Sequence, residues 1–187
     1  MERKNGDWTI TATKKIFSND FFTVFEDDVV QPDDERSKYA TISFKPGVAV
    51  LPVDDEGFIY LTRQFRYALH RDNIEVVSGG YETHEEILDA AKRELHEEMG
   101  IDAAEWLPLG RIDAITSITD SHTDMFIARG LSFTKPEREG TETIEPVKMP
   151  LRVALGKVLA GAITHGETCV LVMRAWFEEQ KKTAAGT

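Results

Sequence analysis

Apolar and polar residues alternate along much of the first half of the chain, a pattern typical of β-strands. Short clusters of Gly, Pro, Asn and Asp separate these stretches and predict turns, and residues 31–38 read as a polar loop. The expected strands cover residues 8–17, 21–30, 39–44, 47–53, 57–65 and 73–80. The last of them runs into the glycine pair Gly79 and Gly80.

The second half of the chain mixes helical and strand patterns. One central helix follows the glycine pair, and a long charged loop is expected at residues 134–146. Two more strands (105–115, 123–131) and two C-terminal helices (150–163, 167–182) are expected, with residues 183–187 as a frayed tail. Because strands and helices do not alternate regularly, an α/β (α+β) sandwich is favoured over a regular βαβ fold.

The central helix has its own start and stop signals. Thr83 and Glu86 have capping-box spacing, and Gly100 is a natural stop because glycine tolerates the left-handed conformation. At about 100° per residue, four residues share one side, which we expect to be buried. They are Leu88, Ala91, Leu95 and Met99.

Three carboxylates, Glu94, Glu97 and Glu98, fall together on an arc that borders this apolar side. Like charges at this spacing destabilise a helix, and acids near the C-terminal end also oppose the helix dipole. A hard divalent cation with oxygen ligands would remove both costs. The alternative is a solvated acidic face with no ligand.

Composition and charge narrow the class of protein only slightly. The chain has 187 residues, 41% of them hydrophobic and 29% charged, which suits one soluble domain. The net charge of −11 disfavours non-specific binding to nucleic acid or to an anionic membrane. It does not disfavour a small anionic ligand, because a bound metal reverses the local sign of a site.

The cysteine content and the apolar segments of the sequence indicate where the protein is located and whether it forms disulfides. The chain has one cysteine, Cys169, within an apolar run, so we expect a core residue rather than a nucleophile and no internal disulfide. The chain has neither a stretch of about 18 apolar residues nor an N-terminal apolar segment of the secretory type. The expected location is therefore the cytoplasm.

The helix and the glycines before it resemble the Nudix box, G-x5-E-x7-R-E-U-x-E-E-x-G-U, where U is apolar. All nine defined positions are filled, by Gly79, Glu85, Arg93, Glu94, Leu95, Glu97, Glu98, Gly100 and Ile101. The resemblance implies a Nudix-type α/β/α sandwich with a mixed sheet and extra N-terminal antiparallel strands. We expect an N-terminal strand region at 1–46 and a catalytic domain at 47–182.

The resemblance also implies hydrolysis of a nucleoside diphosphate linked to another group. Glu94, Glu97 and Glu98 would hold Mg²⁺ or Mn²⁺, with a backbone carbonyl contributed by Ser78. Glu85 and Arg93 would tie the loop to the helix. The glycine pair, Gly79 and Gly80, would let the backbone approach the metal and the phosphates.

A second segment is similar to the branch that cleaves ADP-ribose and other nucleoside diphosphate sugars. It consists of Arg63, Gln64, Phe65 and Arg66, followed by Glu75. An arginine fork suits a diphosphate because it binds two oxygens at once. The alternatives are a solvated strand edge for the arginines and an ordinary surface acid for Glu75.

The chain departs from this branch at two places. It has Val-Ser-Gly-Gly where the branch usually has Pro-Ala-Gly, and it lacks the Pro-Gly pair of a later loop. Asp120, His122 and Asp124 lie in that altered loop and either contact substrate or form a polar surface. Sugars beyond ADP-ribose, GDP-mannose included, therefore stay open.

The general base is expected on the charged loop. Glu142 is favoured among Glu137, Glu139, Glu142 and Glu145, and the loop is long enough to serve as a lid. The resemblance further implies a homodimer built through the strands before Gly47.

Two other functions stay open. The first is a Nudix enzyme that acts on dinucleoside polyphosphates or RNA 5′ ends, although the low pI and the lack of a basic patch disfavour RNA. The second is a regulatory domain that binds a nucleotide sugar without hydrolysing it. Such domains often lose acids from the box, and this chain keeps them all.

Overall fold

The computed structural model describes residues 2–82, 84–137 and 143–185. The chain divides into two compact units: Met1–Pro46 with Asp113–His122, and Gly47–Ile112 with Thr123–Thr187. Throughout the described ranges, helices long and apolar enough to cross a bilayer are absent.

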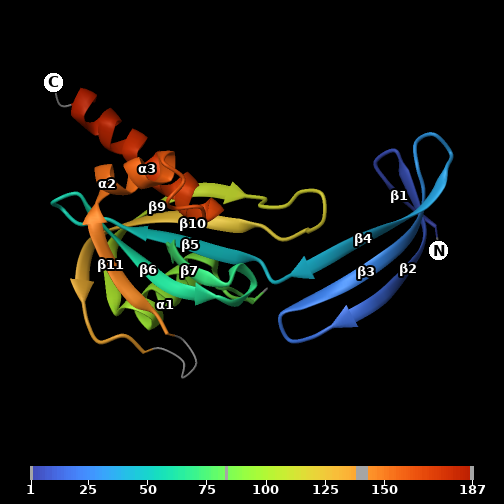
Figure 1. The fold of residues 1–187 in the computed structure, drawn as a ribbon, viewed down its shortest axis with the longest axis horizontal. Coiled ribbons are helices and arrows are strands. Elements are labelled where there is room, and N and C mark those ends of the chain that lie inside the picture. The colour runs from blue at the N-terminus through green and yellow to red at the C-terminus, as the bar shows by residue number, and fades with distance from the viewer. Residues whose placement is uncertain (1, 83, 138–142, 186–187) are drawn as a thin grey trace. The chain divides into compact units, whose positions relative to one another are not determined.

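The first unit is built on a four-stranded antiparallel sheet in the order β1-β2-β3-β4 (Figure 1). Its strands are β1 (Arg3–Asn5), β2 (Trp8–Ser18), β3 (Phe22–Val30) and β4 (Arg36–Phe44). The Asn19 side chain closes the turn between β2 and β3 by accepting the backbone N–H groups of Phe21 and Phe22 at 2.9 and 2.8 Å. β4 begins at Arg36, so the polar loop is shorter than expected.

The segment Asp113–His122 belongs to this first unit although it follows the unit's strands by about seventy residues in sequence. The Ile42 backbone N–H donates to the Ile118 carbonyl at 2.8 Å, and the Tyr39 hydroxyl donates to the Ser117 carbonyl at 2.6 Å. These bonds hold the segment against β4.

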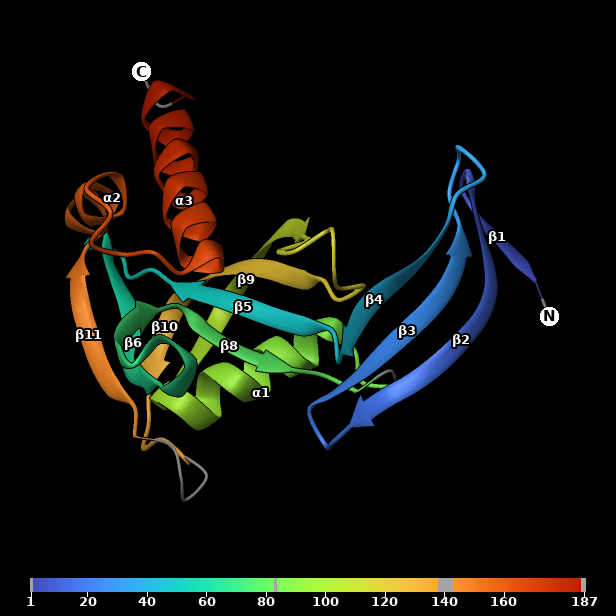
Figure 2. The same ribbon diagram turned by 45° about the vertical axis from the view of Figure 1, so that its right-hand side comes forward.

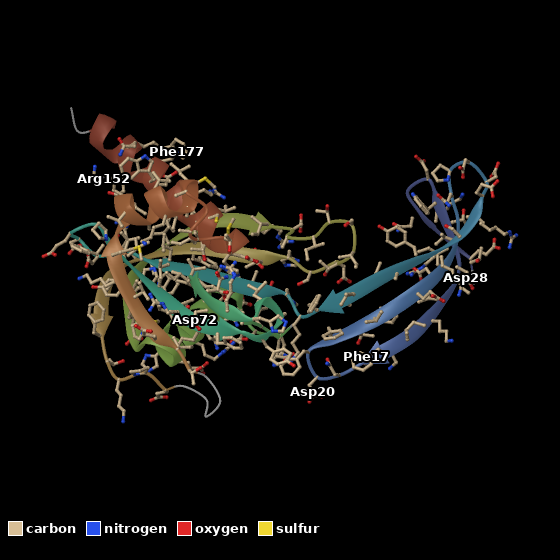
Figure 3. The ribbon with its side chains drawn as sticks, viewed as in Figure 1. Phe17, Asp20, Asp28, Asp72, Arg152 and Phe177 are labelled. Atoms are coloured by element: carbon tan, nitrogen blue, oxygen red, sulfur yellow. The ribbon has the colours of Figure 1, made fainter. Side chains whose placement is uncertain are left out.

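Aromatic side chains lie exposed at the β2–β3 end of the first unit. Phe17 and Asp20 mark this end in Figure 3. Phe22 lies 5.6 Å from both the Phe17 ring and the Phe44 ring, measured between ring centres. Phe21 is 77% exposed, which is unusual for so large an apolar side chain in a monomer.

The second unit contains two sheets. The larger is mixed and has the order β8-β5-β10-β9, with β5 and β10 parallel. Its strands are β5 (Gly47–Pro52), β8 (Val77–Gly80), β9 (Ile101–Ile112) and β10 (Thr123–Phe133). The smaller sheet has the order β11-β6-β7, from β6 (Phe58–Arg66), β7 (Arg71–Glu75) and β11 (Glu145–Pro150). A short 3₁₀ turn, η1 (Tyr67–Leu69), joins β6 to β7.

Helices cover both faces of the larger sheet, as Figure 2 shows with α3 (Gly166–Ala185) above and α1 (Ile87–Met99) below. On β5, Val48 and Val50 are in the cluster with α1, whereas Ala49 and Leu51 are in the cluster with α2 (Leu151–Leu159) and α3. A strand buried on both faces needs apolar residues at every position, which explains the unbroken run at 48–51. The expected α/β/α sandwich, mixed sheet and N-terminal antiparallel strands are confirmed.

Several element boundaries differ from the expectations. The segment 73–80 forms two strands rather than one, because the chain leaves β7 at Glu75 and enters β8 in the other sheet at Val77. β9 begins at Ile101, directly after the helix stop. β11 was not expected, and α3 runs past residue 182 to Ala185.

The central helix begins at Ile87, with Glu86 as its N-cap, and Thr83 lies outside the described residues. Gly100 ends it at a φ of 62°, with its N–H bonded to the His96 carbonyl at 2.8 Å, so the predicted stop is confirmed. The buried side is Ala90, Ala91, Leu95 and Met99. Leu88 was wrongly placed on it: its side chain is 36% exposed.

Candidate active site

Glu94 lies directly against the backbone of Gly79. In β8, Val77 and Gly79 share the face that α1 covers, because alternate residues of a strand point the same way. A Cβ atom at position 79 would overlap the carboxylate carbon and both carboxylate oxygens of Glu94. The absence of a side chain at position 79 therefore places this carboxylate, which is only 13% exposed, over β8.

Small residues bring α1 close enough for this contact. Ala90 and Ala91 are fully buried at the helix–sheet interface, one turn before Glu94. Helix and strand backbones approach most closely where side chains are small. The two alanines, which the sequence shows only as apolar positions, thus place a carboxylate at the edge of the sheet, because β8 is an edge strand.

Arg93 clamps the loop, the helix and the strand end together. Its Nε and Nη2 atoms donate to the two Glu85 oxygens at 2.9 and 3.2 Å, and Nη2 also lies 3.3 Å from the Gly80 carbonyl. Its Nη1 atom donates to Glu94 Oε1 at 2.6 Å and to Glu97 Oε2 at 3.2 Å. The link between loop and helix that the resemblance implied is present in this geometry.

This ion network shifts the pKa of both partners in the expected directions. The hydrogen bond from Arg93 is the main cause that lowers the pKa of Glu85. The hydrogen bond to Glu85, aided by Glu94, raises the pKa of Arg93. Both groups therefore stay charged, and the fork geometry holds the loop before α1 in one place.

The three glutamates of α1 differ in their surroundings. Glu94 is mostly buried, whereas Glu97 and Glu98 are partly exposed. In the described ranges, groups of three or more His, Cys, Asp or Glu side chains that could together hold a metal ion are absent. A complete protein cage is not required, because Mg²⁺ is commonly held by one or two carboxylates together with waters and substrate phosphates. The donor set of hard carboxylate oxygens fits such an ion.

Ser78 lies between Val77 and Gly79 on β8, and it pairs with Ala49 of β5. Strand alternation turns its side chain to the face opposite Val77 and Gly79. A contribution from this residue on the α1 side would therefore come from its backbone.

The arginine segment lies on β6, the middle strand of the smaller sheet. The two arginines therefore do not lie on an edge strand, although their side chains remain accessible to solvent. Arg63 faces Glu145 of β11 across the ladder, with its Nη1 atom 3.4 Å from Glu145 Oε2. Both of these side chains are exposed, so this ion pair contributes little to stability.

Arg66 forms a bidentate pair with Glu75 across the β6–β7 ladder. Its Nε atom donates to Glu75 Oε1 at 3.0 Å and its Nη2 atom donates to Oε2. Glu75 also accepts from the Asn73 amide at 3.0 Å. Glu75 is 3% exposed, so the alternative of an ordinary surface acid is wrong.

Burial raises the pKa of Glu75, but hydrogen bonds from Arg66 and Asn73 and the nearby charges of Arg66 and His165 outweigh burial, and the net pKa is lowered. A buried carboxylate of this kind persists as a charge because its partners satisfy it. Sequence reasoning missed Asn73 and His165 here, since neither residue has a local motif.

The candidates for the general base are divided between described and undescribed parts of the chain. Glu139 and Glu142 lie outside the described residues. The Glu137 backbone N–H donates to the Glu97 carbonyl at 3.0 Å, which holds the start of the charged loop against the end of α1. Glu145 belongs to β11.

The two acids and the histidine of the altered loop belong to different units of the structure. Asp120 accepts from Ser43 at 3.3 Å within the first unit, as part of the segment that also contains His122. Asp124 lies in β10, mostly buried, and accepts from the Tyr81 hydroxyl at 3.1 Å. Burial and this bond raise the pKa of Tyr81. Cys169 packs against the core, as expected.

A sequence model described as the NUDIX domain matches residues 43–152, which include the strands of the mixed sheet, α1 and the arginine segment. The chain belongs to the NUDIX domain family.

Similar proteins are known over nearly the full length of the chain. It is 30% identical over 170 residues to an ADP-ribose pyrophosphatase of Bacillus subtilis (strain 168), covering 90% of this chain and 92% of that protein. It is 29% identical over 177 residues to a methanol dehydrogenase activator of Bacillus methanolicus, covering 91% and 93%. A crystal structure of an ADP compounds hydrolase shares the fold, with a TM-score of 0.76 at 21% identity, covering 95% of this chain and 98% of that one.

Proposed function

We propose that this chain is a metal-dependent pyrophosphohydrolase that cleaves nucleoside diphosphate sugars to a nucleoside monophosphate and a sugar phosphate. ADP-ribose is the first substrate proposed, because the relative in Bacillus subtilis is an ADP-ribose pyrophosphatase. The observation that carries the proposal is the Glu94 carboxylate, fixed between Gly79 and Arg93 beside two further glutamates. GDP-mannose and related sugars belong to the same proposed class.

The proposed metal site and the proposed diphosphate site are joined by a very short piece of chain. Glu75 pairs with Arg66, and Gly79 contacts the Glu94 carboxylate. Only three residues of the chain separate Glu75 from Gly79. Four steps of extended chain span at most about 14 Å between Cα atoms. This upper bound is compatible with one nucleoside diphosphate sugar that reaches both groups.

The proposed roles follow from these positions. Glu94, Glu97, Glu98 and the Ser78 carbonyl would hold a divalent cation, Mg²⁺ or Mn²⁺. When bound, such an ion neutralises phosphate oxygens and orients an attacking water. Arg93 keeps Glu94 and Glu97 in place, Gly79 makes room for the Glu94 carboxylate, and Gly80 would let phosphate oxygens approach the backbone.

Other residues would bind the substrate and move the proton. Arg66 would bind the diphosphate oxygens through guanidinium N–H groups while Glu75 fixes the Arg66 plane, and Arg63, three residues earlier on β6, is the second arginine proposed for the substrate. Glu142 is proposed as the general base that takes the proton from the attacking water. This assignment rests on sequence alone.

The test is product analysis with a panel of substrates. The purified protein is incubated with Mg²⁺ and ADP-ribose, GDP-mannose, UDP-glucose, a diadenosine polyphosphate or triphosphorylated RNA, with EDTA as the control. Metal-dependent release of a nucleoside monophosphate from diphosphate sugars is expected. Cleavage of only the polyphosphate or the RNA would replace diphosphate sugars by that compound as the proposed substrate class.

A regulatory binding domain is the second candidate, favoured by the relative that is a methanol dehydrogenase activator. In that case one panel member would bind tightly in calorimetry and none would be consumed. The retention of every acid of the box is the observation against it.

A homodimer through the first unit is also proposed. The exposed apolar side chains at the β2–β3 end, Ile16, Phe17, Phe21 and Phe44, form the surface that a second copy would cover.

A further inference from the structure

Glu75 is held from a second side by the start of α3, which the proposed chemistry does not use. The His165 Nε2 atom lies 3.8 Å from Glu75 Oε2 and 3.0 Å from Glu167 Oε2. The ring therefore stands between two carboxylates, both of them largely buried, at 3% and 17% side-chain exposure. Removing it would leave two like charges near each other without the group that separates them.

The orientation of the His165 ring is set by Thr168, whose side chain is fully buried. The Thr168 Oγ1 atom accepts the Val76 backbone N–H at 2.9 Å and lies 2.9 Å from His165 Nδ1. Val76 donates to Thr168, the Thr168 hydroxyl and His165 Nδ1 share one hydrogen bond, and a proton on Nε2 is directed to the Glu167 and Glu75 carboxylates.

Further contacts make this junction rigid. The Arg71 guanidinium of β7 donates to the Thr164 hydroxyl at 3.0 Å. The Cys169 N–H donates to the His165 carbonyl at 2.9 Å, which ties His165, the residue directly before α3, to the first turn of that helix. The ionisable and charged groups around the ring are therefore Glu75 and Arg71 of β7, Arg66 of β6, and Glu167 and Cys169 of α3. In Figure 3, Asp72 marks the position of β7.

We propose that His165 is a positioning residue for substrate binding, which holds the Glu75–Arg66 pair in the geometry that receives the diphosphate. The inference rests on the proposed function, because it assigns Arg66 to the substrate. His165 itself does not touch the reacting atoms. It acts by keeping the Glu75 carboxylate in place, so that the bidentate bond fixes the plane of the Arg66 guanidinium.

The test compares KM and kcat for ADP-ribose with Mg²⁺ in the wild type, His165→Leu and His165→Gln. His165→Leu is expected to raise KM about ten-fold and to change kcat less than about three-fold, because the lost bonds orient a binding group and not the metal-bound end. His165→Gln is expected to restore part of the loss, since its amide still donates to Glu167. Glu178→Gln, further along α3, is the matched control and should leave KM unchanged.

A double-mutant cycle separates positioning from a general loss of structure. In an Arg66→Lys background the bidentate pair no longer exists, so His165→Leu should add less than about a two-fold change in KM. Equal effects in both backgrounds would overturn the inference. If His165→Leu does not fold, as judged by circular dichroism, Glu167→Gln takes its place in the cycle, with the same non-additivity expected.

The outcomes also separate this inference from the proposed function. Turnover by the wild type together with an unchanged KM in His165→Leu overturns the role of His165 and leaves the function standing. A wild type that hydrolyses no diphosphate sugar overturns the function and, with it, this inference.

Discussion

At the scale of single residues, Gly79 and Glu94 share one small volume. The carboxylate fills the space in which any other residue at position 79 would carry its Cβ atom. The contact links a strand residue to a helix residue fifteen positions later, and Arg93 holds the helix side of it through Glu85 and Gly80. The position of Glu94 thus depends on backbone shape as much as on charge.

Gly79→Ala should therefore lower kcat for ADP-ribose hydrolysis by about a hundred-fold. The added methyl group displaces the Glu94 carboxylate, and a shift of about 1 Å in a catalytic group costs this much. Steady-state kinetics with saturating Mg²⁺ provide the measurement. Gly156→Ala is the matched control, because a Cβ there meets no atom within 4 Å and the residue lies inside α2. A Gly79→Ala enzyme as active as the control would contradict the packing argument.

At the scale of elements, β7 joins the smaller sheet to α3 through Glu75. The carboxylate takes two bonds from β6, one from within β7, and lies beside His165 at the start of α3. Its lowered pKa means that the folded state binds the proton less well than the unfolded state does. Its contribution to stability is therefore complete above the unfolded-state pKa and is lost as the pH falls through the folded-state value.

The difference in unfolding free energy between the wild type and Glu75→Gln should accordingly shrink as the pH falls from about 6 to about 3. Urea denaturation at a series of pH values measures it. Glu56→Gln, at an exposed turn, should show a small difference with little pH dependence. A wild-type advantage that is the same at every pH would argue against an ionised, bonded Glu75.

Local sequence patterns predicted those helices and strands whose position is set by nearby residues. The stop at Gly100, the buried Ala91, Leu95 and Met99, and most strands follow from periodicity and glycine conformation. The box placed its glutamates on one helix because their spacing is helical. Leu88 was misplaced because periodicity gives a direction around the helix but not where the covering sheet ends.

Long-range pairing could not be predicted in this way. Nothing near Val76 signals that the chain changes sheets there, since the apolar pair Val76 and Val77 runs across the junction without a turn residue. The burial of Glu75 depends on α3, ninety residues later in the chain. For the same reason the place of Asp113–His122 beside the N-terminal strands was not foreseen.

At the scale of the whole molecule, the first unit leaves an aromatic surface exposed that a second copy would bury. The wild type should sediment as a dimer, and the double variant Phe17→Ser, Phe21→Ser should shift it towards the monomer because the interface loses its apolar anchors. Phe177→Ser is the matched control, a phenylalanine on α3 whose exposure lies between those of Phe17 and Phe21 and which is also labelled in Figure 3. A wild type that sediments as a monomer at tens of micromolar would remove the dimer proposal.

The central claim is that the acids of α1 hold a metal for pyrophosphate cleavage. The measurement that tests it most directly is kcat for ADP-ribose with saturating Mg²⁺ in Glu98→Gln, beside Glu105→Gln on the exposed part of β9. Glu98→Gln should lose at least about a hundred-fold in kcat while its melting temperature without metal stays close to that of the wild type. Near-normal turnover in Glu98→Gln would contradict the metal site.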